Sequence, residues 1–194
     1  MSATTSEGTR RSPKKKAIVI ATSVVLVIAL VGIVSALTGG KVSPGQKNSL
    51  TSSKLVGHHI HDFSLDGLNG GVITSPWSSG HSSVLVFFAS YCGPCKGEMP
   101  KIAKYIRTHN LSPIDVVAVD AVDKRSAAQA MIKKDGVTFP VAYDPNGTIT
   151  TGLFGFEDVP ESVFLNARGV VKGVYYGAIP KNVLIAGLKT LTST

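Results

Sequence analysis

Residues 91–95 read Tyr91-Cys92-Gly93-Pro94-Cys95 and contain the only two cysteines of this 194-residue chain. The apolar run Val84–Ala89 precedes them, and apolar residues at helical spacing follow them from Lys96 onward. An apolar run of this length without alternation is typical of a central strand that is buried on both faces. Two thiols between such a strand and the start of a helix predict a dithiol–disulfide redox centre.

Strands and helices are expected to alternate around this centre. The helix that starts at Cys95 should continue to about His109, with a kink at Pro100. The remaining patterns predict strands at 63–67, 70–73, 114–119 and 137–143, helices at 126–135 and 148–154, a hairpin of 162–165 and 170–176, and a closing helix from Pro180. Parallel strands with crossover helices, followed by an antiparallel hairpin, predict an α/β fold with a mixed central sheet.

The N-terminal part of the chain has the pattern of a membrane anchor. Residues 1–16 are basic, and residues 17–37 carry no charge. A helix over this apolar run would measure about 30 Å, which matches the hydrocarbon core of a bilayer. Because basic flanks stay on the cytoplasmic side, we expect a cytoplasmic tail at 1–16, a single-pass transmembrane helix at 17–37, and the rest of the chain outside the cell membrane.

A signal peptide cleaved after Ala36 is the alternative for this segment, since residues 34–36 are small enough for a cleavage site. The apolar run exceeds the roughly 7–15 residues of the apolar region within a signal peptide, which favours the uncleaved anchor. Residues 38–56 are rich in Gly, Ser, Lys and Asn and predict a flexible linker. The folded domain is then expected at 57–194, and we expect it to be a monomer.

Charge and metal-ligand patterns exclude several other functions. Half of the formal net charge of +8 lies in residues 1–16, and no basic stripe with interleaved aromatic residues follows, so nucleic-acid binding is not expected. Two cysteines are too few for a zinc site of four thiolates. His58, His59 and His61 could ligate a metal, but in a strand or coil they point in different directions. We therefore expect no metal and no cofactor apart from a Cys92–Cys95 disulfide.

Three stretches, residues 87–100, 139–147 and 159–171, together resemble the thioredoxin superfamily. More narrowly, they resemble the membrane-anchored TlpA/ResA-like thiol–disulfide oxidoreductases, and the resemblance covers residues 55–192. It implies a thioredoxin-like fold with an N-terminal strand pair and a helix–strand insertion at 124–143.

The resemblance also implies roles for the residues of the redox centre. Cys92 would be the exposed nucleophile, because a helix N-terminus favours a thiolate. Cys95 would be the buried resolving thiol that releases the mixed-disulfide partner. Glu98 matches a carboxylate that shifts thiol pKa values and relays protons, although an exposed helical glutamate is the alternative.

On the substrate side, the resemblance implies that Pro160 is a cis-proline facing the two cysteines. The backbone of Val159 would then pair with an extended substrate, and Tyr91, Gly93 and Pro94 would lie beside it. The sequence departs from the pattern of thioredoxins at two positions. Val86 stands in place of a buried aspartate, so that proton relay is missing, and Tyr91 replaces a tryptophan.

These patterns predict a membrane-tethered thiol–disulfide oxidoreductase. Its expected task is the reduction of disulfides in exported proteins such as apocytochrome c, with electrons from a membrane thiol carrier. One alternative is an oxidase that donates disulfides to secreted proteins, because redox potentials differ widely within one fold. A second alternative is an anchored binding or chaperone module in which the disulfide is only structural.

Overall fold

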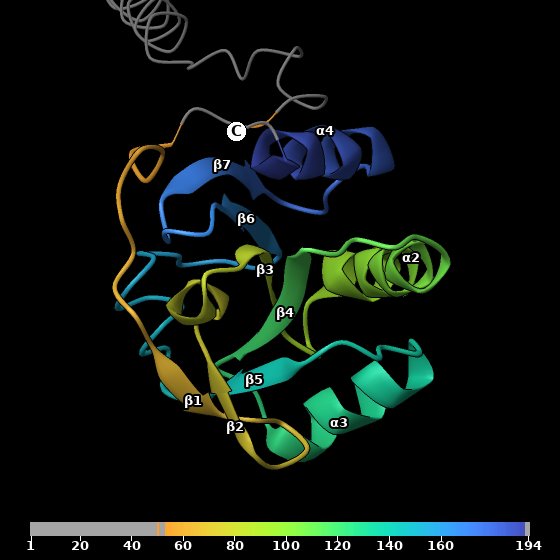
Figure 1. Cartoon of the computed structure of the whole chain (residues 1–194). Coiled ribbons are helices and arrows are strands. Elements are labelled where there is room, and N and C mark those ends of the chain that lie inside the picture. Colours follow the sequence, from red (N-terminus) through yellow and green to blue (C-terminus); the bar gives the residue numbers. More distant parts are fainter. Residues whose placement is uncertain (1–49, 51–52, 193–194) are drawn as a thin grey trace, which may run out of the picture. The chain divides into compact units, whose positions relative to one another are not determined.

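The computed structural model describes residue 50 and residues 53–192 (Figure 1). The predicted basic tail, membrane span and Ala36 cleavage site, and most of the predicted linker, lie outside these residues. Within the described part, no helix is both long and apolar enough to cross a bilayer. In chain order the elements are β1 (Ser64–Asp66), β2 (Val72–Thr74), η2 (Pro76–Ser79), β3 (Ser82–Phe88), α2 (Gly93–Thr108), β4 (Ile114–Ala121), α3 (Arg125–Lys134), β5 (Val141–Asp144), β6 (Glu161–Leu165), β7 (Val171–Tyr176) and α4 (Lys181–Thr192).

The described residues form a five-stranded sheet in the order β5-β4-β3-β6-β7, and β1 pairs with β2 in a separate hairpin. Strands β3, β4 and β5 run parallel, whereas β6 is antiparallel to both β3 and β7. The predicted mixed α/β sheet and N-terminal strand pair are therefore confirmed. In the register, Phe88 pairs with Asp120 and Phe87 pairs with Glu161, so the ends of β3 and β4 and the start of β6 share one edge of the sheet.

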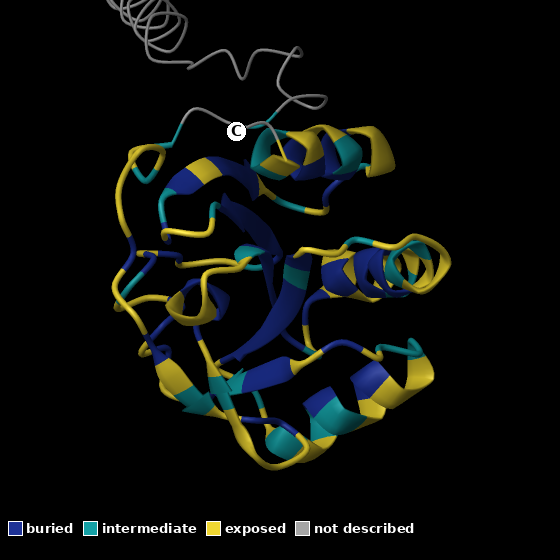
Figure 2. Cartoon of the chain, viewed as in Figure 1, coloured by how far each residue is buried: buried dark blue, intermediate teal, exposed yellow. Residues whose placement is uncertain are grey.

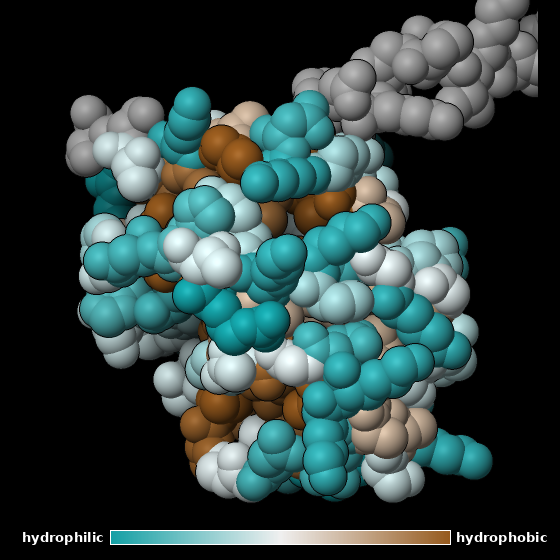
Figure 3. Space-filling model, turned by 90° about the vertical axis from the view of Figure 1, so that its right-hand side faces the viewer, coloured by the Kyte–Doolittle hydropathy of each residue, from teal (hydrophilic) through white to brown (hydrophobic). Residues whose placement is uncertain are grey.

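The helices α2, α3 and α4 lie on the same side of the sheet (Figure 1). Figure 2 shows that the central strands are buried along their length, as expected for strands covered on both faces. Met99 and Phe139 belong to the hydrophobic cluster beneath the helices. Seen from the helical side, most of the surface is hydrophilic, with apolar side chains showing in recesses between the polar ones (Figure 3).

The opposite face of the sheet is covered by the N-terminal segment, by η2 and by the loop between β5 and β6. The predicted loop 75–83 contains the short 3-10 helix η2, and its Trp77 packs edge to face on Phe63 with ring centroids 5.6 Å apart. Gly169, with φ +71°, lies against Trp77, and a Cβ there would be 2.7 Å from the indole ring. Leu50 and Leu55, from the end of the predicted linker, also pack onto the domain.

The prediction of a helix at 148–154 is wrong, because these residues form successive turns. The carboxylate of Asp144 accepts hydrogen bonds from the backbone N–H groups of Ile149 and Thr150 at 3.1 and 2.7 Å, and from the Thr150 hydroxyl at 2.8 Å. The carbonyl oxygens of Gly147 and Ile149 each accept from the N–H groups four and five positions later, and the segment ends at Gly155 (φ +68°), so the hydrogen bonds do not follow the pattern of a regular α-helix. The predicted strand 137–143 begins only at Val141, because the N–H of Val137 closes the end of α3 by donating to Ile132.

Candidate redox site

The two cysteines lie at the N-terminus of α2 and form a disulfide, with their Cα atoms 5.3 Å apart. Cys92 is the N-cap residue, and its Sγ accepts a hydrogen bond from the backbone N–H of Cys95 at 3.1 Å. Gly93 and Pro94 fill the first helical positions, where a missing proline N–H costs no intrahelical bond. After reduction, the free N–H groups and the dipole of the helix would stabilise a thiolate on Cys92.

Cys92 and Cys95 differ in solvent exposure, but the difference is smaller than the sequence predicts. Cys95 is fully buried, whereas Cys92 is 7% exposed in the disulfide form. The expectation of an exposed Cys92 is therefore wrong in degree, because Val159 covers its sulfur. The order of accessibility still agrees with Cys92 as the attacking thiol and Cys95 as the resolving thiol.

The Val159–Pro160 peptide bond is cis, as the resemblance implies, and it faces the disulfide. The Sγ of Cys92 lies 3.4 Å from the carbonyl oxygen of Val159. Residues that are 67 positions apart in the chain thus meet at the edge where β3 ends and β6 begins. The Ser112–Pro113 bond, before β4, is also cis, and no sequence pattern predicted it.

Glu98 lies one turn after Cys95 on the buried side of α2 and is 3% exposed. Its Oε1 accepts a hydrogen bond from the backbone N–H of Ile179 at 2.7 Å, which ties α2 to the segment before α4. Its Oε2 has no hydrogen-bond partner among the described residues. Burial raises the pKa of Glu98 to about 7, although the Ile179 hydrogen bond and Lys101 act in the opposite direction. The alternative of an exposed helical glutamate is therefore wrong.

Two further buried carboxyls at the same edge of the sheet were missed by the sequence reasoning. Glu161 directly follows Pro160, and burial, aided by Asp158, raises its pKa to about 8. Asp120 is the penultimate residue of the apolar strand β4, and burial, aided by the charge of Asp123, raises its pKa to about 8 as well. Asp120 lies near the end of an apolar strand beside the one that leads into the cysteines, and Glu161 follows the cis-proline. These positions are the signal that could have identified them.

The two departures from the thioredoxin pattern have different consequences. Val86 is fully buried in the hydrophobic cluster that also contains both cysteines, so the interior beneath the disulfide is apolar at this position. Ser162, its partner on β6, is also buried. Tyr91 is 64% exposed and keeps an aromatic surface next to Cys92.

A groove of about 170 Å³ opens beside Cys92. Of the residues predicted for the substrate side, Tyr91, Pro94 and Val159 line this groove, whereas Gly93 is exposed outside it. The other walls come from the end of β4, the turns anchored by Asp144 and the segment before Val159; they comprise Ala121, Val122, Thr150, Thr151, Phe156, Glu157 and Asp158. The groove can therefore hold a side chain of a partner while the partner's backbone passes the sulfur of Cys92.

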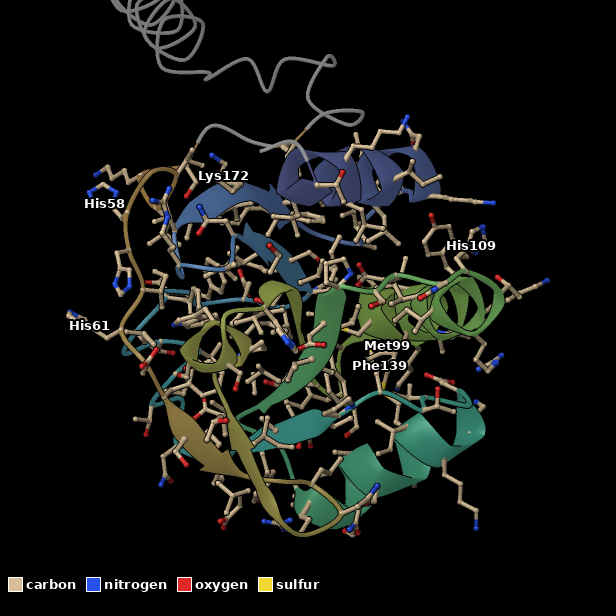
Figure 4. All side chains as sticks on the ribbon, viewed as in Figure 1. His58, His61, Met99, His109, Phe139 and Lys172 are labelled. Carbon is tan, nitrogen blue, oxygen red and sulfur yellow. A yellow bond between two sulfur atoms is a disulfide. The ribbon has the colours of Figure 1, made fainter. Side chains whose placement is uncertain are left out.

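The three histidines lie away from this site. His58 and His61 point outward from the N-terminal segment (Figure 4), and the rings of His59 and His61 are 6.3 Å apart. Among the described residues, no group of three or more His, Cys, Asp or Glu side chains is arranged to hold a metal ion.

Comparison with known proteins agrees with this geometry. A family model described as Redoxin matches residues 55–190. The thiol-disulfide oxidoreductase ResA of Bacillus subtilis (strain 168) is 26% identical over 174 residues, which cover 88% of this chain and 91% of that protein. Sporulation thiol-disulfide oxidoreductase A of the same strain is 27% identical over 118 residues, or 59% of this chain and 70% of the relative. The solved structure of MTB dsbF, in its mixed oxidized and reduced forms, is 27% identical with a TM-score of 0.60, covering 66% of this chain and 94% of that one.

Proposed function

Since the chain belongs to the redoxin family and is a thiol–disulfide oxidoreductase, we propose that its Cys92–Cys95 dithiol reduces disulfides of exported proteins such as apocytochrome c. The observation that carries this proposal is the contact between the Cys92 sulfur and the carbonyl oxygen of Val159, 3.4 Å away. A backbone that precedes a cis-proline and touches the reactive sulfur can align an extended substrate for attack.

The reaction proceeds in two exchange steps. The thiolate of Cys92 attacks one sulfur of the substrate disulfide, and the other substrate sulfur leaves as a thiolate that takes up a proton. The thiolate of Cys95 then attacks the Cys92 sulfur, which closes the Cys92–Cys95 disulfide and releases the second substrate thiol. Two electrons and two protons pass from the protein to the substrate. A membrane thiol carrier returns the protein to its dithiol form by the same exchange in reverse.

Glu98 is the proposed proton-transfer group for this cycle. It lies on the same helix face as Cys95, because residues three positions apart are neighbours on a helix. A carboxyl whose pKa is about 7 can both give and accept a proton near neutral pH. Its position compensates for Val86, which offers no titratable group beneath the disulfide.

The proposed location is outside the cell membrane, with the domain held by the apolar run at 17–37. The support is the charge-free length of this run and the basic residues before it. A tethered reductase in an oxidising compartment needs electrons from the membrane, which is why a membrane thiol carrier is proposed as donor.

Two experiments test the proposal on the full chain. Equilibration with a thiol buffer gives the potential of the Cys92–Cys95 pair. A value well below about −200 mV supports a reductase, whereas a value near −120 mV contradicts it and favours the oxidase. In cells, Cys95→Ala should accumulate mixed disulfides with substrates, and Cys92→Ala should not. Unchanged function in the Cys92→Ala strain would instead favour an anchored module with a structural disulfide.

A further inference from the structure

The groove beside Cys92 has a charge opposite to that of the whole chain. Within the part of the chain that the structure describes, the charged residues that line it are Glu157 and Asp158, both exposed. The loop 145–160 contains no Lys, Arg or His, although the chain has 20 Lys and Arg against 12 Asp and Glu. Glu157 and Asp158 thus form an acidic rim, which is a local feature and does not follow from the overall composition.

Apolar surface lies next to this acidic rim. Tyr91 is 64% exposed and Val122 is 53% exposed, and both line the groove. Val122 has φ +49°, an uncommon conformation for a β-branched residue, and its N–H donates to the carbonyl oxygen of Asp144 at 3.0 Å. Exposed apolar walls beside carboxylates match the two parts of a long cationic side chain, its methylene stem and its charged head.

The segment that leads into Glu157 and Asp158 is anchored by packing on the sheet. Phe154 and Phe156 each contact Phe87 with ring centroids 5.0 Å apart, and the Thr151 hydroxyl donates to the carbonyl oxygen of Phe156 at 3.1 Å. Glu157 follows directly after this anchored residue. The backbone that carries the two carboxylates is therefore anchored, which lowers the conformational entropy lost when a ligand binds.

We propose that this groove is a subsite for a lysine or arginine side chain that neighbours the reactive cysteine of a protein substrate. The methylene stem lies against Tyr91 and Val122, and the cationic head pairs with Glu157 and Asp158. The inference rests on the proposed function and specifies its substrate class: extended segments with a basic residue beside the cysteine.

The buried carboxyls near the groove add little charge at neutral pH. Burial raises the pKa of Asp120 and of Glu161 to about 8, so both are largely protonated at pH 7. Glu157 and Asp158, in contrast, are exposed and line the groove itself. These two residues are therefore the ones to change in a test.

The test uses three peptides, each closed by an internal disulfide and identical except for one residue beside the first cysteine, which is Lys, Gln or Glu. The reduced full-length protein is mixed with each peptide, and the reaction is quenched by alkylation and quantified by mass spectrometry. Each turnover oxidises one Cys92–Cys95 dithiol and reduces one peptide disulfide. The same peptides reduced by dithiothreitol give their intrinsic reactivity ratio, by which the protein's ratio is divided.

The corrected rate constant for the Lys peptide should exceed that for the Glu peptide by about tenfold at low ionic strength. The preference should shrink towards unity at about 1 M salt, where the Debye length is about 3 Å. In the double variant Glu157→Gln/Asp158→Asn the ratio should fall to within about twofold of unity. The matched control, Asp115→Asn, removes an exposed carboxylate near the start of β4 and should keep the tenfold preference.

A corrected ratio near unity in the parent protein would overturn the inference, as would an equal loss of preference in Asp115→Asn. A preference that survives in the double variant would also overturn it. Reduction of the Gln peptide reports the proposed reductase activity alone. Failure of that activity is therefore distinguishable from failure of the preference for a basic residue. The reverse reaction, from oxidised protein and dithiol peptides, should show the same preference, because the subsite acts in both directions of exchange.

Discussion

Replacement of Glu98 by Gln tests whether this buried carboxyl carries a raised pKa. The change keeps the shape of the side chain and an acceptor for the Ile179 N–H, which donates to Oε1 at 2.7 Å. It removes only the capacity to ionise. Because Glu98 is 3% exposed, ionisation inside the folded protein places an uncompensated charge in the interior.

The sign and size of the effect follow from proton linkage. The pKa of Glu98 rises from 4.5 to about 7 on folding, so between these values the folded state binds more protons than the unfolded state. Its contribution to stability is therefore complete below about pH 4.5 and is lost as the pH rises to about 7. Integration between pH 5 and pH 8 gives a loss of about 2.5 kcal/mol in the free energy of unfolding.

The assay is urea unfolding of the oxidised protein at pH 5 and pH 8, followed by the fluorescence of Trp77, the only tryptophan of the chain. The advantage of Glu98→Gln over the parent should be larger at pH 8 than at pH 5 by about 2.5 kcal/mol. Asp120 and Glu161 titrate in both proteins and cancel. The exposed control Glu157→Gln should show no such difference between the two pH values. An advantage of Glu98→Gln that is equal at both pH values, within about 0.5 kcal/mol, would refute the reasoning.

Two further substitutions test the packing that positions the site. Gly187→Ala should destabilise the protein by about 1–3 kcal/mol in urea unfolding, because a Cβ at this position would lie 2.3 Å from the Phe164 ring. Gly97 on α2 has no atom within 4 Å of such a Cβ, so Gly97→Ala should stabilise the protein by about 1 kcal/mol through helix propensity. Equal effects at both glycines would argue against close contact between α4 and β6. Asp144→Ala should cost about 3 kcal/mol in urea unfolding, because its buried carboxylate accepts hydrogen bonds from two backbone N–H groups and one hydroxyl. In the same measurement, Asp66→Ala on the exposed hairpin should cost less than about 0.5 kcal/mol.

The sequence predicts the centre of the fold well because the signals there are local. The apolar run Val84–Ala89 and the helical spacing after Cys95 depend only on near neighbours in the chain. The cis bond before Pro160 followed from resemblance, since a proline by itself has only about a 5–6% chance of being cis.

The positions of the buried carboxyls in the sequence make them candidates, but their burial could not be predicted from near neighbours in the chain. Asp120 and Glu161 lie in stretches where a charged residue usually faces solvent, and only the strand register shows that β4 and β6 carry them to one covered edge. The turns at 148–154 have apolar spacing that fits a helix, but their backbone hydrogen bonds mix four- and five-residue spacings and the chain breaks at Gly155 (φ +68°). Such contacts depend on tertiary structure and cannot be read from a short stretch of sequence.

The shallow exposure of Cys92 restricts the folding state of the proteins it can act on. Cys92 is 7% exposed and Val159 lies against its sulfur. A disulfide on the rigid surface of a folded protein would therefore contact the segment at Val159 before it could reach the Cys92 sulfur. A flexible, extended segment can enter. We therefore expect the centre to act on extended or unfolded segments of its protein substrates, so that the rate at which each substrate folds sets the time available for thiol–disulfide exchange.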